Sequence, residues 1–182
     1  MRVEGLACGY DGPPLFADLS FVARAGEVVT LRGANGSGKS TLLRTLAGLR
    51  DASAGTITME GEADYLGHAL GLKRDLTGRQ HLAFWSDLAG GTLDEDPLAI
   101  DRTLDLPVRA LSRGQAQRLA LSRMLLARRP IWLLDEPTGP FDAAGLAAFD
   151  RMLGDHAARG GTAIVATHRG IDPPCPVVDV AL

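Results

Sequence analysis

Residues 33–40 read Gly33-Ala34-Asn35-Gly36-Ser37-Gly38-Lys39-Ser40 and come directly after Val28–Leu31 and Arg32. They match the pattern G-x-x-x-x-G-K-S/T, in which glycines let successive backbone N–H groups turn inward and hold phosphate oxygens. The mechanism needs an apolar strand before the loop and a helix after it, since a helix N-terminus also attracts anions. The stretch therefore predicts a strand, a phosphate-binding loop and a helix that begins at Lys39, although a glycine-rich turn can match by chance.

The loop residues divide into distinct expected roles. Residues 33–38 supply backbone N–H groups, and Lys39 reaches the β- and γ-phosphates of a nucleotide. Ser40 is a candidate Mg²⁺ ligand, and Thr41 completes the nucleotide-binding set at the start of the helix.

Two further apolar runs end in polar residues. Ile131–Leu134 is followed by Asp135 and Glu136, and Thr162–Thr167 precedes His168. Buried parallel strands read as continuous apolar runs, and ligands bind at the carboxyl ends of such strands. We expect Asp135 to hold Mg²⁺, Glu136 to act as general base on the attacking water, and His168 to donate to the γ-phosphate. Taken alone, these residues also fit a solvated strand end and a structural histidine.

Composition excludes several classes of protein. The chain has 182 residues, and 19 basic against 22 acidic side chains give a net charge of −3, which argues against a nucleic-acid partner. No apolar stretch approaches the roughly 20 residues of a membrane span, and residues 1–12 lack the apolar run of a signal peptide. Cys8 and Cys175 form no disulfide framework or metal-ligand spacing, so two reduced thiols in a cytoplasmic protein are expected.

Short apolar runs alternate with amphipathic segments, which is typical of an α/β fold. Strands are expected at Val3–Ala7, Val28–Leu31, Gly55–Met59, Ala63–Leu66, Ile131–Leu134, Thr162–Ala166 and Val177–Val180, and helices from Lys39, Thr77, Arg113 and Ala143. Thr77 and Ser112 are each followed by glutamine three residues on, which is the spacing of a capping box. Residues 68–111 contain no convincing strand. We expect one domain over residues 1–182 with a helical insertion at about residues 69–113.

The stretch Leu111-Ser-Arg-Gly-Gln115 resembles the signature motif of ABC transporter ATP-binding subunits, and the resemblance runs over essentially the whole chain. It implies the ABC-ATPase fold of P-loop NTPases, with a RecA-like parallel sheet core, an antiparallel β subdomain and a short helical subdomain. It also implies ATP and Mg²⁺ as cofactors and a head-to-tail homodimer. ATP then lies between residues 33–40 of one subunit and Ser112, Gly114 and Gln115 of the other. A helix-capping role for Ser112 and Gln115 is compatible with this role.

Other motif positions of the family are also present in this chain, and at two of them the residue differs from the family's usual one. Tyr10 stands where the family stacks an aromatic ring on adenine, although a surface-turn role fits as well, and Asp142 stands at the aspartate of the D-loop. The signature contains Arg113, which is strained if its backbone needs a positive φ and harmless if the backbone is helical. His68 replaces the family's usual glutamine; an approach to Mg²⁺ or to the water is its expected role.

Three stretches at and after His68 point to one subfamily within this resemblance. Tyr65–His68, Gly71–Thr77 and His81–Trp85 are similar to the ATP-binding subunit of the haem exporter of bacterial cytochrome c biogenesis. This similarity implies integral membrane partner subunits and a peripheral position on the cytoplasmic side of the inner membrane. ATP hydrolysis then drives export of haem or release of a haem chaperone, with haem contacted only indirectly.

Other functions stay open on the sequence alone. An exporter of another small molecule and a soluble assembly ATPase both fit the motifs. A DNA-repair ATPase head does not fit, because no long heptad run is present, and Glu136 and His168 argue against a scaffold that does not hydrolyse. The resemblance implies a docking surface near residues 68–95; its apolar candidates are Leu70, Leu72, Leu76, Phe84 and Trp85. Phe84 and Trp85 fit a small core of the insertion equally well.

Overall fold

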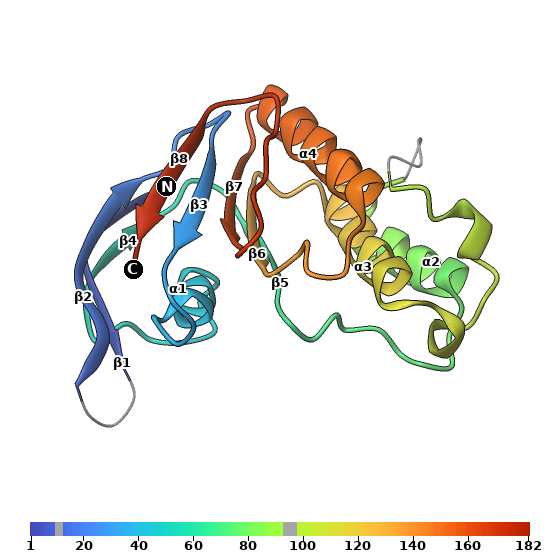
Figure 1. Cartoon of the computed structure of the whole chain (residues 1–182), viewed down its shortest axis with the longest axis horizontal. Helices are drawn as coiled ribbons and strands as arrows, with labels where there is room; N and C mark the ends of the chain where they lie inside the picture. The colour runs from blue at the N-terminus through green and yellow to red at the C-terminus, as the bar shows by residue number, and fades with distance from the viewer. Residues whose placement is uncertain (10–12, 93–97) are drawn as a thin grey trace.

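The computed structural model describes residues 1–9, 13–92 and 98–182 (Figure 1). These residues form a three-stranded antiparallel sheet in the order β2-β1-β4 and a five-stranded parallel sheet in the order β5-β6-β7-β3-β8. The strands are β1 (Arg2–Gly9), β2 (Pro14–Val22), β3 (Val28–Arg32), β4 (Ala54–Thr58), β5 (Ala63–Leu66), β6 (Ile131–Asp135), β7 (Thr162–Ala166) and β8 (Val177–Ala181). The α-helices are α1 (Lys39–Leu46), α2 (Gly78–Ala89), α3 (Arg113–Ala127) and α4 (Ala143–Ala158), with 3₁₀ turns at Asp101–Thr103 and Val108–Ala110.

The parallel sheet is covered on both faces, which explains its continuous apolar runs. Along β6, Ile131 and Leu133 join the core that contains Leu42 of α1. Trp132 and Leu134 point to the other face and join the core that includes residues of α3 and α4. Figure 1 shows the antiparallel sheet and α1 on one side of the parallel sheet and α3 and α4 on the other. The expected α/β architecture with a parallel core and a separate antiparallel sheet is therefore confirmed.

Both expected capping boxes form in full. Thr77 Oγ1 accepts from the Gln80 backbone N–H while Gln80 Oε1 accepts from the Thr77 N–H, and Ser112 and Gln115 exchange the same pair of hydrogen bonds. Arg113 is the first residue of α3 and is not among the residues with positive φ. The arginine in the signature is therefore unstrained.

In the segment between β5 and α3, the neighbouring aromatic residues Phe84 and Trp85 differ in burial. Trp85 is 7% exposed and packs in the core that includes α3, whereas Phe84 is 60% exposed. Leu88, one turn after Phe84, is 76% exposed. Trp85 therefore belongs to the core of the insertion, whereas Phe84 is exposed, as a docking surface would require. Leu70 and Leu72 are partly buried against the same core as Trp85.

The sequence analysis did not predict β2. β2 begins at a proline, contains Asp18 at a φ of 55°, and pairs with β1 through several register shifts. Proline and aspartate are depleted in strands, and an irregular register weakens the alternating pattern that sequence reasoning depends on.

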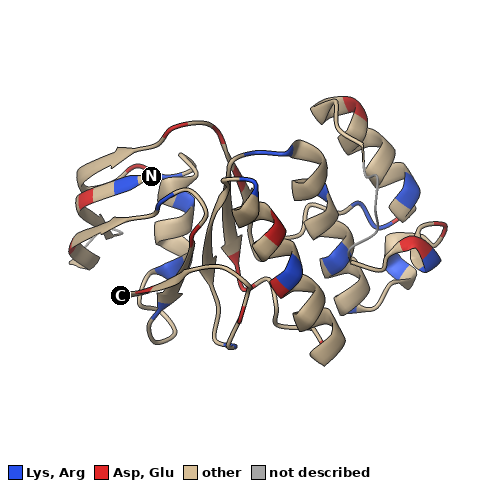
Figure 2. Cartoon of the chain, turned by 90° about the horizontal axis from the view of Figure 1, so that it is seen from above, with Lys and Arg blue, Asp and Glu red and all other residues tan. Residues whose placement is uncertain are grey.

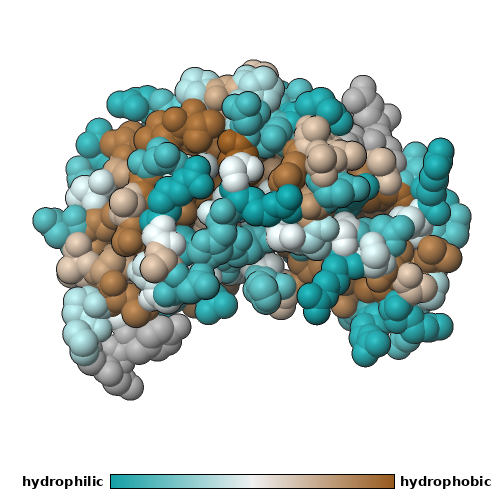
Figure 3. All heavy atoms as spheres, in the orientation of Figure 1, coloured by the Kyte–Doolittle hydropathy of each residue, from teal (hydrophilic) through white to brown (hydrophobic). Residues whose placement is uncertain are grey.

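The surface carries charges of both signs and limited apolar area. Acidic and basic residues are interspersed over the elements in Figure 2. Apolar side chains gather over β8 in the space-filling view (Figure 3), where Val177 and Val178 are 41% and 37% exposed. Within the described ranges, no helix combines the length and hydrophobicity that crossing a membrane requires.

Candidate functional site

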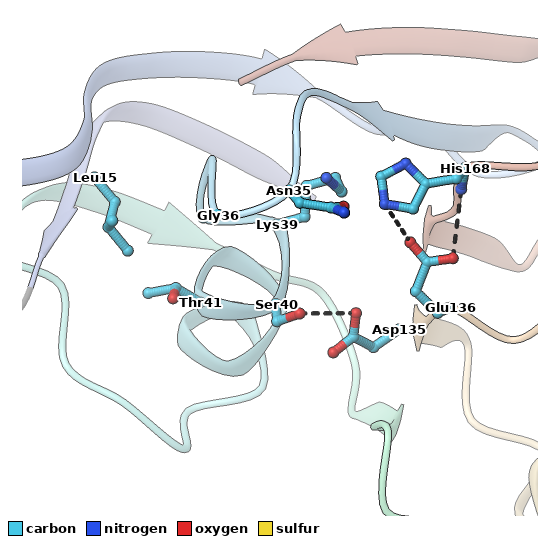
Figure 4. Close-up of a pocket in the computed structure, with 10 residues that line it drawn as sticks. Leu15, Asn35, Gly36, Lys39, Ser40, Thr41, Asp135, Glu136 and His168 are labelled. Carbon is cyan, nitrogen blue, oxygen red and sulfur yellow. Dashed lines mark hydrogen bonds and ion pairs between the residues drawn. The ribbon is translucent and has the colours of Figure 1, made fainter.

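A cavity of about 550 Å³ lies at the carboxyl ends of β3, β6 and β7 (Figure 4). Because neighbouring parallel strands end at the same edge of a sheet, residues far apart in sequence meet there. The cavity is lined by Leu15, Asn35, Gly36, Gly38, Lys39, Ser40, Thr41, Asp135, Glu136 and His168. Most of the loop residues, the acidic pair and the histidine singled out from the sequence therefore share one cavity, whereas Gly33, Ala34 and Ser37 do not line it.

The loop that ends at Gly38 leaves the start of α1 open. Gly38 is the N-cap at a φ of 104°, and no side chain caps the helix. A Cβ atom at this position would lie 2.8 Å from the Phe16 ring, so only glycine fits both the conformation and the space. Uncapped N–H groups at a helix N-terminus fit a bound phosphate.

Lys39 is held inside the loop. Its side chain is buried, and Nζ donates to the carbonyl oxygens of Gly33 at 2.8 Å and Ala34 at 2.9 Å. These two contacts fold the ammonium group over the loop, which places a positive charge beside the uncapped N-terminus of α1. The combination concentrates positive potential where phosphate oxygens would bind.

The hydroxyl of Ser40 and the carboxylate of Asp135 meet across the cavity. Ser40 Oγ donates to Asp135 Oδ1 at 3.0 Å (Figure 4). Asp135 is 5% exposed, so its carboxylate is aimed at the loop rather than at solvent. A hydroxyl and a carboxylate are oxygen ligands of the kind that Mg²⁺ takes together with water and substrate phosphates. The residues present therefore fit a nucleotide-bound Mg²⁺ ion.

Glu136 and His168 face each other beside the loop. Glu136 Oε1 lies 3.2 Å from His168 Nε2, and the His168 backbone N–H donates to Oε2 at 3.4 Å. Oε1 is buried, and its approach to His168 does not meet hydrogen-bond geometry, so this oxygen makes no hydrogen bond. Glu136 also adopts a φ of 51°, which is unusual for a residue with a side chain. Glu136 lines the cavity beside His168, and a carboxylate in this position is suited to taking a proton from water when it comes within hydrogen-bond reach of it.

Sequence reasoning missed the residues that join the two loops carrying Glu136 and His168. The buried hydroxyls of Thr138 and Thr167 lie 3.0 Å apart, and Arg169 Nη1 donates to the Thr138 carbonyl at 3.1 Å. These contacts fix the loop after β6 against the loop after β7. The signal available in the sequence was a threonine within two residues of each proposed catalytic side chain.

Leu15 is another cavity residue that the sequence analysis did not predict. It lines the cavity from β2, the strand that was absent from the sequence-based expectation. A cavity wall built by an irregular edge strand has no motif to reveal it.

The signature residues lie apart from this cavity. Ser112, Gly114 and Gln115 stand at the start of α3 and do not line it. A Cβ atom on Gly114 would lie 3.3 Å from the Pro140 carbonyl oxygen, which places the signature beside the loop before α4. Asp142 in that loop caps α4 by accepting from the Gly145 N–H at 2.8 Å and lies 3.3 Å from Arg118. Within one chain, the signature and the phosphate loop do not form a common site.

The structure does not test the expected roles of His68 and Tyr10. His68 is exposed two residues after β5 and is not among the cavity-lining residues. Tyr10 lies outside the residues that the structure describes, as does the acidic patch Asp94-Glu95-Asp96. Their expected roles stay predictions.

Comparison with known proteins assigns the family. Residues 16–139 match the family model described as ABC transporter. The chain belongs to this family. The chain is 45% identical over 179 residues to the cytochrome c biogenesis ATP-binding export protein CcmA of Rhodopseudomonas palustris (strain BisB5), with 91% of this chain and 90% of that protein covered. Its identity to the protein of the same name in Bradyrhizobium diazoefficiens is 46% over 190 residues, covering 94% and 95%. The resemblance seen in the sequence is thereby confirmed.

Solved structures agree on the ABC fold. A putative ABC transporter ATP-binding protein from Pyrococcus furiosus superposes with a TM-score of 0.83 at 24% identity, covering 100% of this chain and 96% of that one. An ATP-binding subunit of an ABC transporter gives a TM-score of 0.79 at 25% identity, covering 92% and 78%. The expected ABC-ATPase fold is confirmed, and family membership makes the chain an ATP-binding, ATP-hydrolysing transporter subunit.

Proposed function

We propose that this ABC ATPase is the motor subunit of an exporter complex in cytochrome c biogenesis. In that complex it would couple ATP hydrolysis to haem export or to release of a haem chaperone. The observation that carries the proposal is the cavity that joins Lys39, Ser40, Asp135 and Glu136, in a chain that is 45% identical to a cytochrome c biogenesis export protein. Haem is contacted indirectly in this account, and no nucleic acid takes part.

The residues of the cavity divide the work of hydrolysis. Residues 33–38 and Thr41 hold ATP through the loop and the start of α1, and Lys39 neutralises the β- and γ-phosphates. Ser40 and Asp135 would hold Mg²⁺, which supplies charge neutralisation on the phosphate oxygens. Glu136 accepts a proton from the attacking water, and His168 donates a hydrogen bond to the γ-phosphate. A metal role for His68 and adenine stacking by Tyr10 are part of the same proposal.

A second copy of the chain would complete the site. The signature residues Ser112, Gly114 and Gln115 stand at a helix N-terminus, which favours a negatively charged group. Since they do not line the cavity of their own chain, a head-to-tail dimer would present them to ATP bound by the other copy. Support comes from the shared fold of a dimeric ATP-binding cassette in a post-hydrolysis state, solved with ADP and Pi, with a TM-score of 0.75 at 20% identity.

The membrane path would belong to other subunits. We place the chain on the cytoplasmic side of the bacterial inner membrane, as a peripheral subunit bound to integral membrane partners. The exposed apolar side chains Phe84 and Leu88 on α2 support a partner contact at this helix.

Complementation tests the proposal. A bacterial host lacking its own cytochrome c biogenesis ATP-binding subunit receives this chain, and covalently bound haem in c-type cytochromes is measured by haem staining. We expect staining to return with the native chain and to stay absent with Lys39→Ala at equal protein level. Retained staining with Lys39→Ala would contradict the proposal. So would a native chain that hydrolyses ATP but never co-purifies with membrane subunits, which would favour a soluble assembly ATPase.

A further inference from the structure

The His168 side chain has few contacts of its own to hold it in place. It is half-exposed, and among the described residues its ring approaches one charged partner, with Nε2 lying 3.2 Å from Glu136 Oε1. Its reach towards the cavity therefore depends on where its backbone stands. The proposed function needs this side chain at the γ-phosphate, so the contacts that fix the backbone around His168 affect the reaction directly.

The residues on either side of His168 fix this backbone. The Arg169 N–H donates to Thr167 Oγ1 at 3.1 Å, which closes a short turn with His168 in its middle. The Thr167 hydroxyl also lies 3.0 Å from the hydroxyl of Thr138, and both threonines are buried. The turn is thus attached on one side to the loop that follows β6.

The Arg169 side chain supplies the second attachment of the turn. Its Nη1 donates to the carbonyl oxygens of Thr138 at 3.1 Å and Phe141 at 2.5 Å. Within the described part of the chain, the guanidinium group makes no other hydrogen bond and no ion pair with a carboxylate. Arg169 is not among the residues that line the ATP cavity, so any effect on hydrolysis has to pass through the turn.

The loop that receives these hydrogen bonds is well packed. Phe141 is 4% exposed, and its N–H donates to the Thr138 carbonyl at 3.1 Å. The guanidinium carbon of Arg118, on α3, lies 5.8 Å from the centroid of the Phe141 ring. This loop is therefore a firm support against which Arg169 can hold the turn.

We propose that Arg169 is a positioning residue for ATP hydrolysis. Its guanidinium group holds the turn at residues 167–169 against Thr138 and Phe141, so that His168 stays beside Glu136. The inference rests on the role proposed above for His168. Loss of the guanidinium removes one of the two attachments of the turn and lets His168 move, while the phosphate loop keeps its hold on ATP.

A double-mutant cycle of Arg169→Met and His168→Ala tests this inference. Turnover at saturating ATP is measured for the native chain, both single variants and the double variant, each in the complex purified from membranes. ATP affinity and the thermal unfolding midpoint are measured alongside. Methionine keeps an unbranched side chain but cannot donate to the two carbonyls. Arg151→Met, at an exposed position of α4, is the matched control.

We expect Arg169→Met to lower turnover about tenfold or more, because displacing a reacting group by about 1 Å can cost as much as 100-fold. ATP affinity should stay at the native level, and Arg151→Met should change neither quantity. In the His168→Ala background, Arg169→Met should lower turnover no further, because the side chain through which Arg169 acts is missing. If Arg169→Met lowers the unfolding midpoint, Arg169→Gln takes its place in the cycle, since the shorter polar side chain leaves room for water at the two carbonyls.

Two results would overturn the inference about Arg169 alone. The first is native turnover in a folded Arg169 variant. The second is an equal loss of turnover with and without the His168 side chain, which would show that Arg169 supports the fold or acts on another group. A native rate for His168→Ala would instead contradict the role proposed for His168 and, with it, the premise of this inference.

Discussion

Ser40 and Asp135 are 95 residues apart in the sequence, yet the Ser40 hydroxyl donates to the Asp135 carboxylate at 3.0 Å. The first stands in the opening turn of α1 and the second at the end of β6, and β7 and β3 bring these elements to one edge of the parallel sheet. Two oxygen-bearing side chains of the kind that Mg²⁺ takes as ligands thus meet beside the phosphate loop.

Replacement of Asp135 by asparagine should weaken the response of ATP hydrolysis to Mg²⁺. The amide keeps the shape and can still meet Ser40, but it removes the negative charge from a buried position. We expect the Mg²⁺ concentration for half-maximal ATPase activity to rise about tenfold or more, measured at fixed ATP in the complex purified from membranes. Asp51→Asn, at an exposed position after α1 that does not line the cavity, is the matched control. An unchanged Mg²⁺ titration would remove Asp135 from the proposed metal site.

Lys39→Ala should abolish turnover without unfolding the chain. The substitution removes the buried ammonium group that contacts the Gly33 and Ala34 carbonyls and leaves the loop backbone in place. Loss of a charge aimed at the reacting phosphate typically costs about 100-fold or more in rate. ATPase assays measure the loss of turnover, and the thermal unfolding midpoint shows whether the variant stays folded. Lys73→Ala, at the other lysine of the chain, should leave turnover at the native level.

Trp85 and Phe84 should differ sharply in their effect on stability. Trp85→Ala empties a buried position in the core that includes α3 and should cost about 3–5 kcal/mol of unfolding free energy. Phe84→Ala removes an exposed ring and should stay within about 0.5 kcal/mol. Chemical denaturation of the two variants in parallel checks the comparison. Equal destabilisation would contradict the packing of α2.

The buried imidazole of His156 should make folding sensitive to acid. Burial lowers its pKa from 6.5 to about 4, with a further decrease from the nearby Arg159 charge. Above pH 6.5 the ring is neutral in both states and its contribution to stability is fully present. As the pH falls from 6.5 to 4, the unfolded chain binds a proton that the folded chain does not, so the unfolding free energy decreases.

Urea unfolding of the native chain and His156→Phe at several pH values measures this contribution. Phenylalanine keeps a ring against Trp132 but cannot titrate, so its stability should fall less steeply between pH 6.5 and 4. The carboxylates common to both chains affect the two curves alike. Parallel curves would contradict the assignment to His156.

The parts of the fold that sequence reasoning predicted are those where local chemistry and tertiary structure agree. The apolar run at Ile131 predicted a buried strand because a strand covered on both faces needs apolar residues at every position. Thr77 and Ser112 marked helix starts because capping is a local interaction. β2 escaped because its irregular pairing with β1 depends on residues far away in sequence.

The candidate site divides in the same way. The phosphate loop and the strand-end carboxylates can be predicted from the sequence, because their chemistry requires fixed residue types at fixed spacing. Sequence alone did not separate Phe84 from Trp85, because neighbouring residues on a helix point in different directions and only the packing of α3 decides which is buried. The contact between Thr138 and Thr167 likewise depends on β6 and β7 being neighbours in the sheet.

In the proposed mechanism, Glu136 takes the proton from the water that attacks ATP. The most direct test of this step is the rate of ATP hydrolysis by Glu136→Gln in the complex purified from membranes, with ATP binding measured alongside and the exposed Glu60→Gln as control. A general base contributes roughly 100- to 10,000-fold, so we expect turnover to fall by that factor while ATP still binds and holds two copies together. Turnover near the native rate in a folded, ATP-binding variant would contradict the account.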